Sequence, residues 1–177
     1  MKRREIYWAS RTSASSGGGI YKAEMDGSSP TLVLGIGYVE GISIDYEQSR
    51  IYWAASYTSS TIESSDLDGN GRQTFITTSP DIYKLRICGS EIYWLQSGIG
   101  IRSASKFDGS NERTIASGSI NTAFLTVLSS DVQPSTRVNN CAGDPCSHIC
   151  VLTATNYRCL CPEGLQLNKT DGKTCCK

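Results

Sequence analysis

The stretch Arg50-Ile51-Tyr52-Trp53-Ala54 contains the tripeptide that decides the fold. The same Ile-Tyr-Trp tripeptide occurs at Ile6–Trp8 and at Ile92–Trp94, so its three copies are spaced 45 and 41 residues apart. A second landmark, an apolar residue followed by Asp-Gly, comes after each copy, at Met25-Asp26-Gly27, Leu67-Asp68-Gly69 and Phe107-Asp108-Gly109. Two marks that recur together at a period of about 40 residues indicate repeats of one supersecondary unit, none of which buries its apolar face alone.

The residues around the middle copy predict strands. Gly41–Asp45 alternates apolar and polar residues, as a half-buried strand does. Arg50–Ala54 is aromatic and β-branched, and Ser60–Ser64 and Arg72–Thr77 make a third and a fourth short run. Asp68-Gly69-Asn70-Gly71 is a strong hairpin signal, because Gly and Asn accept positive φ at little cost. Four short antiparallel strands in about 40 residues describe one blade of a β-propeller.

These units resemble the YWTD repeats (class B repeats) of the low-density lipoprotein receptor family. The middle unit carries the match through Gly41, Asp45, Tyr52-Trp53, Ile62 and Leu67-Asp68-Gly69. The family's Thr-Asp pair never follows Tyr-Trp here, since the chain has Ala9-Ser10, Ala54-Ala55 and Leu95-Gln96. In the family that acid helps to tie neighbouring blades, so weak polar bonding between blades is expected.

The last 37 residues belong to a different class of sequence, because seven of the eight cysteines lie from Cys141 onward. A segment this short cannot bury enough apolar surface to fold unaided, so disulfides are expected, although the spacing alone leaves every pairing open. The six cysteines from Cys141 to Cys175 are spaced as in an EGF-like module. That resemblance implies the pairs Cys141–Cys150, Cys146–Cys159 and Cys161–Cys175.

The predicted fold class is all-β. Residues 1-134 are expected to form about three of the six blades of a YWTD propeller, and residues 138-177 a small disulfide-rich EGF-like domain. The first unit lacks its opening strand, and Phe124–Leu128 resembles the strand that closes the family's ring. Because propellers close with roughly 4–8 blades, three do not close a ring. Either the chain is a fragment whose upstream blades lie elsewhere, or two copies pair into six blades, with Leu125–Leu128 supplying the missing strand.

Composition favours an extracellular origin. Lys plus Arg equals Asp plus Glu at 17 each, so no global field points to nucleic acid or to an anionic membrane. The cysteine-dense tail implies an oxidising compartment. No apolar stretch of signal-peptide length follows Met1–Arg4, and no run is long enough to span a bilayer, so membrane attachment is expected through parts absent from this chain. The sequon Asn168-Lys169-Thr170 is a candidate glycosylation site.

The candidate ligand-binding residues lie before or within the predicted innermost strands. Loops at one end of a propeller channel present Tyr, Arg and acidic side chains to protein ligands, a composition typical of binding hot spots. Motif position alone selects Tyr38, Glu40, Tyr83, Lys84 and Arg86. The predicted partner is an extracellular protein.

Other chemistries find little support in the sequence. His148 is the sole histidine, so it is either a pH switch or a solvent-facing side chain of the EGF-like module, and it has no evident serine partner for a hydrolytic triad. The cysteines that zinc would need are allocated to disulfides, and Arg137-Val138-Asn139-Asn140 lacks the acids of a calcium-binding EGF module. No catalytic residue, cofactor or metal is predicted.

Cys88 and Cys176 remain outside the implied pairs. They could bridge to each other, to absent upstream sequence or to a partner chain, and for Cys88 a free buried thiol is the simplest alternative. In the third unit Cys88 falls where the repeat's strand would carry its Asp.

Two functions of different classes follow from the resemblance. The first is the extracellular ligand-binding portion of a low-density-lipoprotein-receptor-related cell-surface receptor, endocytic or Wnt co-receptor-like, on the outer side of the plasma membrane. The second is a secreted or matrix adhesion protein, because nidogen-like proteins and EGF precursors also combine YWTD propellers with EGF modules. An enzyme is not expected.

Overall fold

The computed structural model describes residues 5–56, 59–79, 81–118, 125–127, 139–153 and 156–177. It divides into two compact units by contact. The first contains Met1–Tyr7, Lys22–Thr31 and Ser135–Lys177, and the second contains Trp8–Tyr21 and Leu32–Pro134. The domain bounds expected from sequence, 1-134 and 138-177, stay a prediction.

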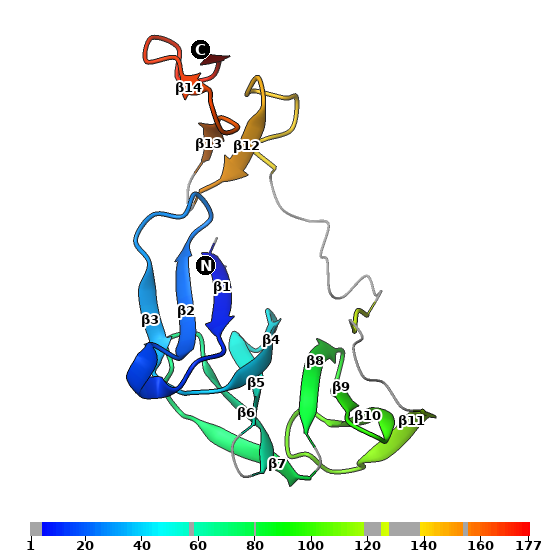
Figure 1. Ribbon diagram of the computed structural model, residues 1–177. Helices are drawn as coiled ribbons and strands as arrows, with labels where there is room; N and C mark the ends of the chain where they lie inside the picture. The colour runs from blue at the N-terminus through cyan, green and yellow to red at the C-terminus, as the bar shows by residue number, and fades with distance from the viewer. Residues whose placement is uncertain (1–4, 57–58, 80, 119–124, 128–138, 154–155) are drawn as a thin grey trace. The chain divides into compact units, whose positions relative to one another are not determined.

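The described chain is nearly all strand, with one 3-10 turn, η1 (Ala14–Ser16) (Figure 1). Blade 1 has three strands in the order β1 (Glu5–Ser10), β2 (Gly19–Glu24) and β3 (Thr31–Leu34). Blade 2 has four, β4 (Val39–Asp45), β5 (Arg50–Ser56), β6 (Ser60–Asp66) and β7 (Gln73–Thr78). Blade 3 repeats this order with β8 (Ile82–Cys88), β9 (Glu91–Gln96), β10 (Gly100–Ser105) and β11 (Arg113–Ser117).

These sheets confirm the predicted all-β class and the partial propeller. The strands of blades 2 and 3 pair antiparallel with their neighbours, as expected for propeller blades. Among the described residues, blade 1 has no counterpart of β4 or β8. The expected closing strand is not formed by Leu125–Val127, which pair with no sheet; Phe124 and Leu128 lie outside the described residues.

Blades 2 and 3 bury a shared apolar core. Because successive side chains of a strand point to opposite faces, alternate residues of each blade meet the other. Blade 2 contributes Tyr52, Ala54, Ile62 and Ile76, and Phe75 packs at their margin. Blade 3 contributes Ile82, Leu85, Ile87, Ile92, Trp94 and Ala104. Tyr52 of the second Ile-Tyr-Trp tripeptide and Ile92 and Trp94 of the third therefore pack between blades 2 and 3.

The Asp-Gly turns explain why glycine recurs with the period of the blades. Gly69 and Gly109 both have positive φ, 90° and 73°. A Cβ on Gly69 would stand 2.5 Å from the Val33 carbonyl oxygen, and one on Gly109 would stand 2.8 Å from that of Phe75. Each turn thus lies directly against the outer strand of the preceding blade, where only a glycine fits.

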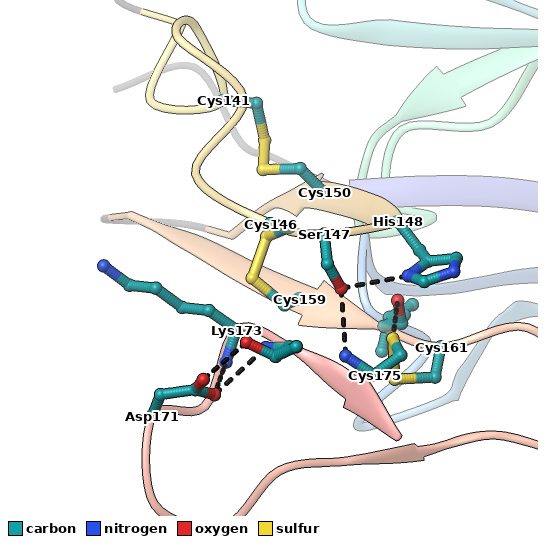
Figure 2. Close-up of a disulfide and its surroundings, with 12 residues drawn as sticks. Cys141, Cys146, Ser147, His148, Cys150, Cys159, Cys161, Asp171, Lys173 and Cys175 are labelled. Carbon is teal, nitrogen blue, oxygen red and sulfur yellow. Dashed lines mark hydrogen bonds between the residues drawn. A yellow bond between two sulfur atoms is a disulfide. The ribbon is translucent and has the colours of Figure 1, made fainter. Parts of the chain in front are cut away.

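The EGF-like segment is held by three disulfides, the pairs that the resemblance implies (Figure 2). Strands β12 (Ile149–Leu152) and β13 (Tyr157–Leu160) form one hairpin, and β14 (Gln166–Leu167) and β15 (Cys175–Cys176) form another. Ser147 Oγ accepts the Cys175 N–H at 2.9 Å and also bonds His148 Nδ1 at 2.9 Å. Few side chains here are buried, so covalent links replace an apolar core.

We expect the turn before β15 to loosen in strong acid. The Asp171 carboxylate accepts hydrogen bonds from the Thr174 hydroxyl and from the backbone N–H groups of Thr174 and Lys173, and these bonds lower its pKa to about 2. A depressed folded-state pKa contributes stability above the unfolded value of 3.8, and this contribution is lost as pH falls toward 2. NMR titration of the Asp171 carboxyl should give a midpoint near 2. A midpoint near 4 would mean that these hydrogen bonds do not stabilise the carboxylate.

Candidate functional site

The first candidate site lies where β4 and β8, the inner strands of blades 2 and 3, run beside each other. Strand β4 is the edge of its sheet, so its outward backbone groups need partners from elsewhere. Lys84 Nζ donates to the Glu40 carbonyl at 2.9 Å, and Arg86 donates to the Ile42 carbonyl at 3.4 Å. Lys84 and Arg86, two of the five candidate residues, therefore donate hydrogen bonds to the edge strand β4.

The Glu40 side chain is bound by a residue that sequence reasoning missed. Arg11 Nε lies 2.6 Å from Glu40 Oε1, and the Glu40 side chain is 7% exposed whereas that of Arg11 is 69% exposed. The hydrogen bond to Glu40 is the main cause that raises the pKa of Arg11, and the charges of Asp81 and Tyr83 add to it. Arg11 belongs to the loop after β1, and no local motif marks it as a partner of Glu40.

Tyr38 lies just before β4 and is held by backbone bonds on both sides. Its N–H donates to the Thr12 carbonyl at 3.0 Å, and its carbonyl accepts from Ser56 N–H at 3.1 Å. The residue has φ of 53° and its side chain is 44% exposed. A non-glycine residue in this region costs about 1–3 kcal/mol and often marks a functional position. We call Arg11, Tyr38, Glu40, Tyr83 and Lys84 the channel-edge cluster.

A second polar site lies at the opposite ends of the same strands. Lys106 Nζ is 2.5 Å from Asp45 Oδ2, and both side chains are 3% exposed. Asp45 Oδ1 accepts from the N–H groups of Glu47 and Gln48, and Tyr52 donates its hydroxyl hydrogen to the Lys106 carbonyl at 3.2 Å. Burial raises the pKa of the Tyr52 hydroxyl.

The expectation of weak polar bonding between blades is therefore wrong for blades 2 and 3. The absent Thr-Asp pair is replaced by a tie that uses Asp45 of β4 and Lys106 from the Asp-Gly turn of blade 3. The Asp-Gly turn of blade 3 is one residue longer than that of blade 2. The Gly69 N–H donates to the Asp66 carbonyl, three positions earlier, whereas the Gly109 N–H donates to the Ser105 carbonyl, four positions earlier. A buried ion pair is favourable only when its remaining polar atoms are also bonded. The Glu47 and Gln48 N–H groups supply such bonds to Asp45 Oδ1.

The remaining sequence candidates have simpler surroundings. Cys88 is a partly buried free thiol beside a cavity of about 40 Å³ that Asp45 and Lys106 also line, and Cys176 is an exposed free thiol. His148 is exposed. Asn168 is partly buried in the turn after β14, where its Oδ1 accepts from Thr170 N–H, and its glycosylation stays a prediction.

The described residues offer neither a cluster of metal ligands nor a helix that could span a membrane. Within the described ranges, His, Cys, Asp and Glu side chains do not gather in threes in a way that could hold a metal ion. None of the helices formed by those residues has the length and apolar character that crossing a bilayer requires. Arg137 and Val138, for which the sequence predicts no calcium site, lie outside the described residues.

Comparison with known proteins gives relatives for both segments. Residues 137–175 match the family model described as Coagulation Factor Xa inhibitory site. Low-density lipoprotein receptor-related protein 4 of Homo sapiens is 32% identical over 137 residues, which is 76% of this chain and 7% of that protein. The sortilin-related receptor of Oryctolagus cuniculus is 31% identical over 83% of this chain, and the vitellogenin receptor Yl of Drosophila melanogaster is 28% identical over 84%. The chain spans 7–8% of the length of these relatives.

The fold also has a solved counterpart. A crystal structure of a nidogen/laminin complex contains a chain that matches with a TM-score of 0.56 and 24% identity, over 64% of this chain and 44% of the other. At that identity the likeness concerns the fold alone.

Proposed function

The chain belongs to the low-density lipoprotein receptor-related family of proteins with YWTD repeats and EGF-like modules, and on this premise we propose that it is an extracellular ligand-binding portion of a cell-surface receptor. Its curated relatives are receptors rather than enzymes. An endocytic role is the finer form of the proposal, and a Wnt co-receptor-like role is its variant. The proposed location is the outer side of the plasma membrane, with blades over residues 1-134 and the EGF-like domain over 138-177.

The observation that carries the proposal is the channel-edge cluster. It combines an exposed Tyr38 in a left-handed conformation with the exposed Arg11 guanidinium, which is fixed by the buried carboxylate of Glu40. Tyrosine and arginine held in place by neighbouring residues are typical anchors of protein interfaces, because little side-chain entropy is lost on binding. A protein ligand with acidic side chains fits the outward nitrogens of Arg11.

The alternative is a secreted or matrix adhesion protein, and one observation favours it. One solved structure with a similar fold is that of a nidogen/laminin complex, whereas the three relatives named above are receptors or receptor-related proteins. The two proposals differ in the ligand, since the names of the relatives include a vitellogenin receptor and that of the neighbour includes laminin.

Surface plasmon resonance on the secreted, oxidised chain tests the proposal with purified vitellogenin and laminin as probes. Saturable binding of vitellogenin supports the receptor, and binding of laminin alone supports the matrix protein. Tyr38→Ala should weaken binding at least about tenfold if the cluster is the docking surface, as hot-spot truncations of 1.4 kcal/mol or more do. Tyr46→Ala is the matched control, because Tyr46 is also 44% exposed but lies in the turn after β4. Equal loss in both variants, or binding to neither probe, would count against the proposed site.

A further inference from the structure

Two of the three Asp-Gly turns continue with serine, and their aspartates have the same local role. In blade 1, Asp26 Oδ1 accepts hydrogen bonds from the Ser28 N–H at 3.0 Å and from the Ser28 hydroxyl at 2.6 Å. In blade 3, Asp108 Oδ1 accepts the same two bonds from Ser110, at 3.0 Å and 2.7 Å. One carboxylate oxygen is enough to hold each turn, so the other oxygen of Asp26 can bind a different partner.

The two aspartates differ in what lies beyond the turn. Asp26 Oδ2 lies 2.8 Å from Nη1 of Arg158, and the Asp26 side chain is 9% exposed. Asp108, in contrast, is exposed. The hydrogen bond from the Ser28 hydroxyl is the main cause that lowers the pKa of Asp26, and the bond from Arg158 is the next. The turn of blade 1 therefore binds a cation from a distant part of the chain.

This cation belongs to the EGF-like module. Arg158 lies in β13, opposite Val151 of β12, and the next residue, Cys159, is bonded to Cys146 (Figure 2). Successive side chains of a strand point to opposite faces, so Cys159 is buried in the module while Arg158 points out of it. The module and Lys22–Thr31, which contains the blade 1 turn, belong to the same compact unit. The guanidinium is thus presented by a hairpin that a disulfide holds.

The contact between Asp26 and Arg158 is electrostatic, so its strength depends on salt. The Arg158 side chain is 57% exposed, and an ion pair with an exposed partner is weak and is screened by dissolved ions. Such a pair would not hold two separate molecules together. Here both partners belong to one chain, and the high effective concentration of an intramolecular contact compensates for its weakness.

We propose that the ion pair of Asp26 and Arg158 is a reversible contact that docks the EGF-like module on the turn of blade 1. At low ionic strength the pair holds the hairpin of β12 and β13 on the turn, and high ionic strength releases it. The module therefore has a docked and a free state, and the salt concentration sets their ratio. In the docked state the Arg158 side chain is engaged by blade 1 and is not available to a ligand.

NMR relaxation of the secreted, oxidised chain tests this proposal. At low salt the amides of β12 and β13 should have the same rotational correlation time as those of β2 and β3. Salt at about 1 M, where the screening length is about 3 Å, should shorten the correlation time of the module alone. Arg158→Glu should do the same at low salt, because it places two like charges together. Independent tumbling of the wild-type module at low salt, or a correlation time that neither change alters, overturns the proposal.

The two Asp-Gly-Ser turns supply matched variants. Asp26→Asn keeps the acceptor for Ser28 but removes the charge, so it should release the module, whereas Asp108→Asn should leave it docked. Arg158→Gln should raise the titration midpoint of Asp26 and leave that of Asp108 in the same spectrum unchanged. Asp26→Asn combined with Arg158→Gln should release the module no further than either change alone. An unmoved Asp26 midpoint, or equal release by Asp108→Asn, overturns the contact, and circular dichroism checks that each variant folds.

Discussion

Replacing Trp94 with alanine should destabilise the second unit by about 3–5 kcal/mol, the usual cost of deleting a large aromatic side chain from a packed core. Trp94 is 0% exposed in the core between blades 2 and 3, and its Nε1 donates to Gln96 Oε1 at 3.3 Å. Arg102 also lies over its ring, 5.9 Å from the centroid. Urea unfolding followed by circular dichroism measures the change.

The repeat itself supplies the matched control for this substitution. Trp8→Ala removes the same side chain at the same position of blade 1, where 38% of the residue is exposed. Its cost should be well below that of Trp94→Ala. Equal costs for the two variants would mean that Trp94 does not hold blades together.

The second large effect is expected from breaking the buried ion pair. Asp45→Ala leaves the Lys106 ammonium, 3% exposed, without its counter-ion, and removal of one partner of such a pair typically costs about 3–5 kcal/mol. It also removes the acceptor of the Glu47 and Gln48 N–H groups. We expect a lower urea midpoint with an unchanged slope, because the folded state loses stability and not compactness.

A double variant separates the lost charge partner from the lost packing. Asp45→Asn with Lys106→Met removes both charges and keeps similar volumes and an amide oxygen for the turn. It should recover most of the stability that Asp45→Ala loses, because no uncompensated charge stays buried. If Asp45→Ala and the double variant unfold at the same urea concentration, the ion pair is not what connects these blades.

The sequence predicts the blades well because its signals are local. The alternation in Gly41–Asp45 and the aromatic run Arg50–Ala54 lie within β4 and β5, and the Asp68-Gly69 turn falls between β6 and β7. Cysteine spacing likewise leads, through its resemblance to a known module, to the three disulfides of the structure. In each case the information lies within a few residues or in a spacing.

The sites are less predictable because their partners come from different blades. Arg11 and Glu40 are brought together by the packing of the loop after β1 beside β4, and Lys106 reaches Asp45 because one turn is a residue longer. The absence of the Thr-Asp pair predicts weak polar bonding between blades, and this is wrong for blades 2 and 3. An ion pair between blades requires an acid and a cation, but these need not stand at fixed positions of the motif. Lys84 and Arg86 stay predicted binding residues, and in the structure their side chains donate to backbone carbonyls of β4.

Because the turn of blade 3 has an additional residue, one repeat cannot replace another without changing the contacts between blades. An engineer who duplicated blade 2 to lengthen the array would copy Asp45 together with a turn one position too short to return a cation to it. Each new junction between blades would then bury an Asp45 carboxylate without a cation to pair with it. The unit to transplant is the junction, with β4 and the turn of the following blade moved together.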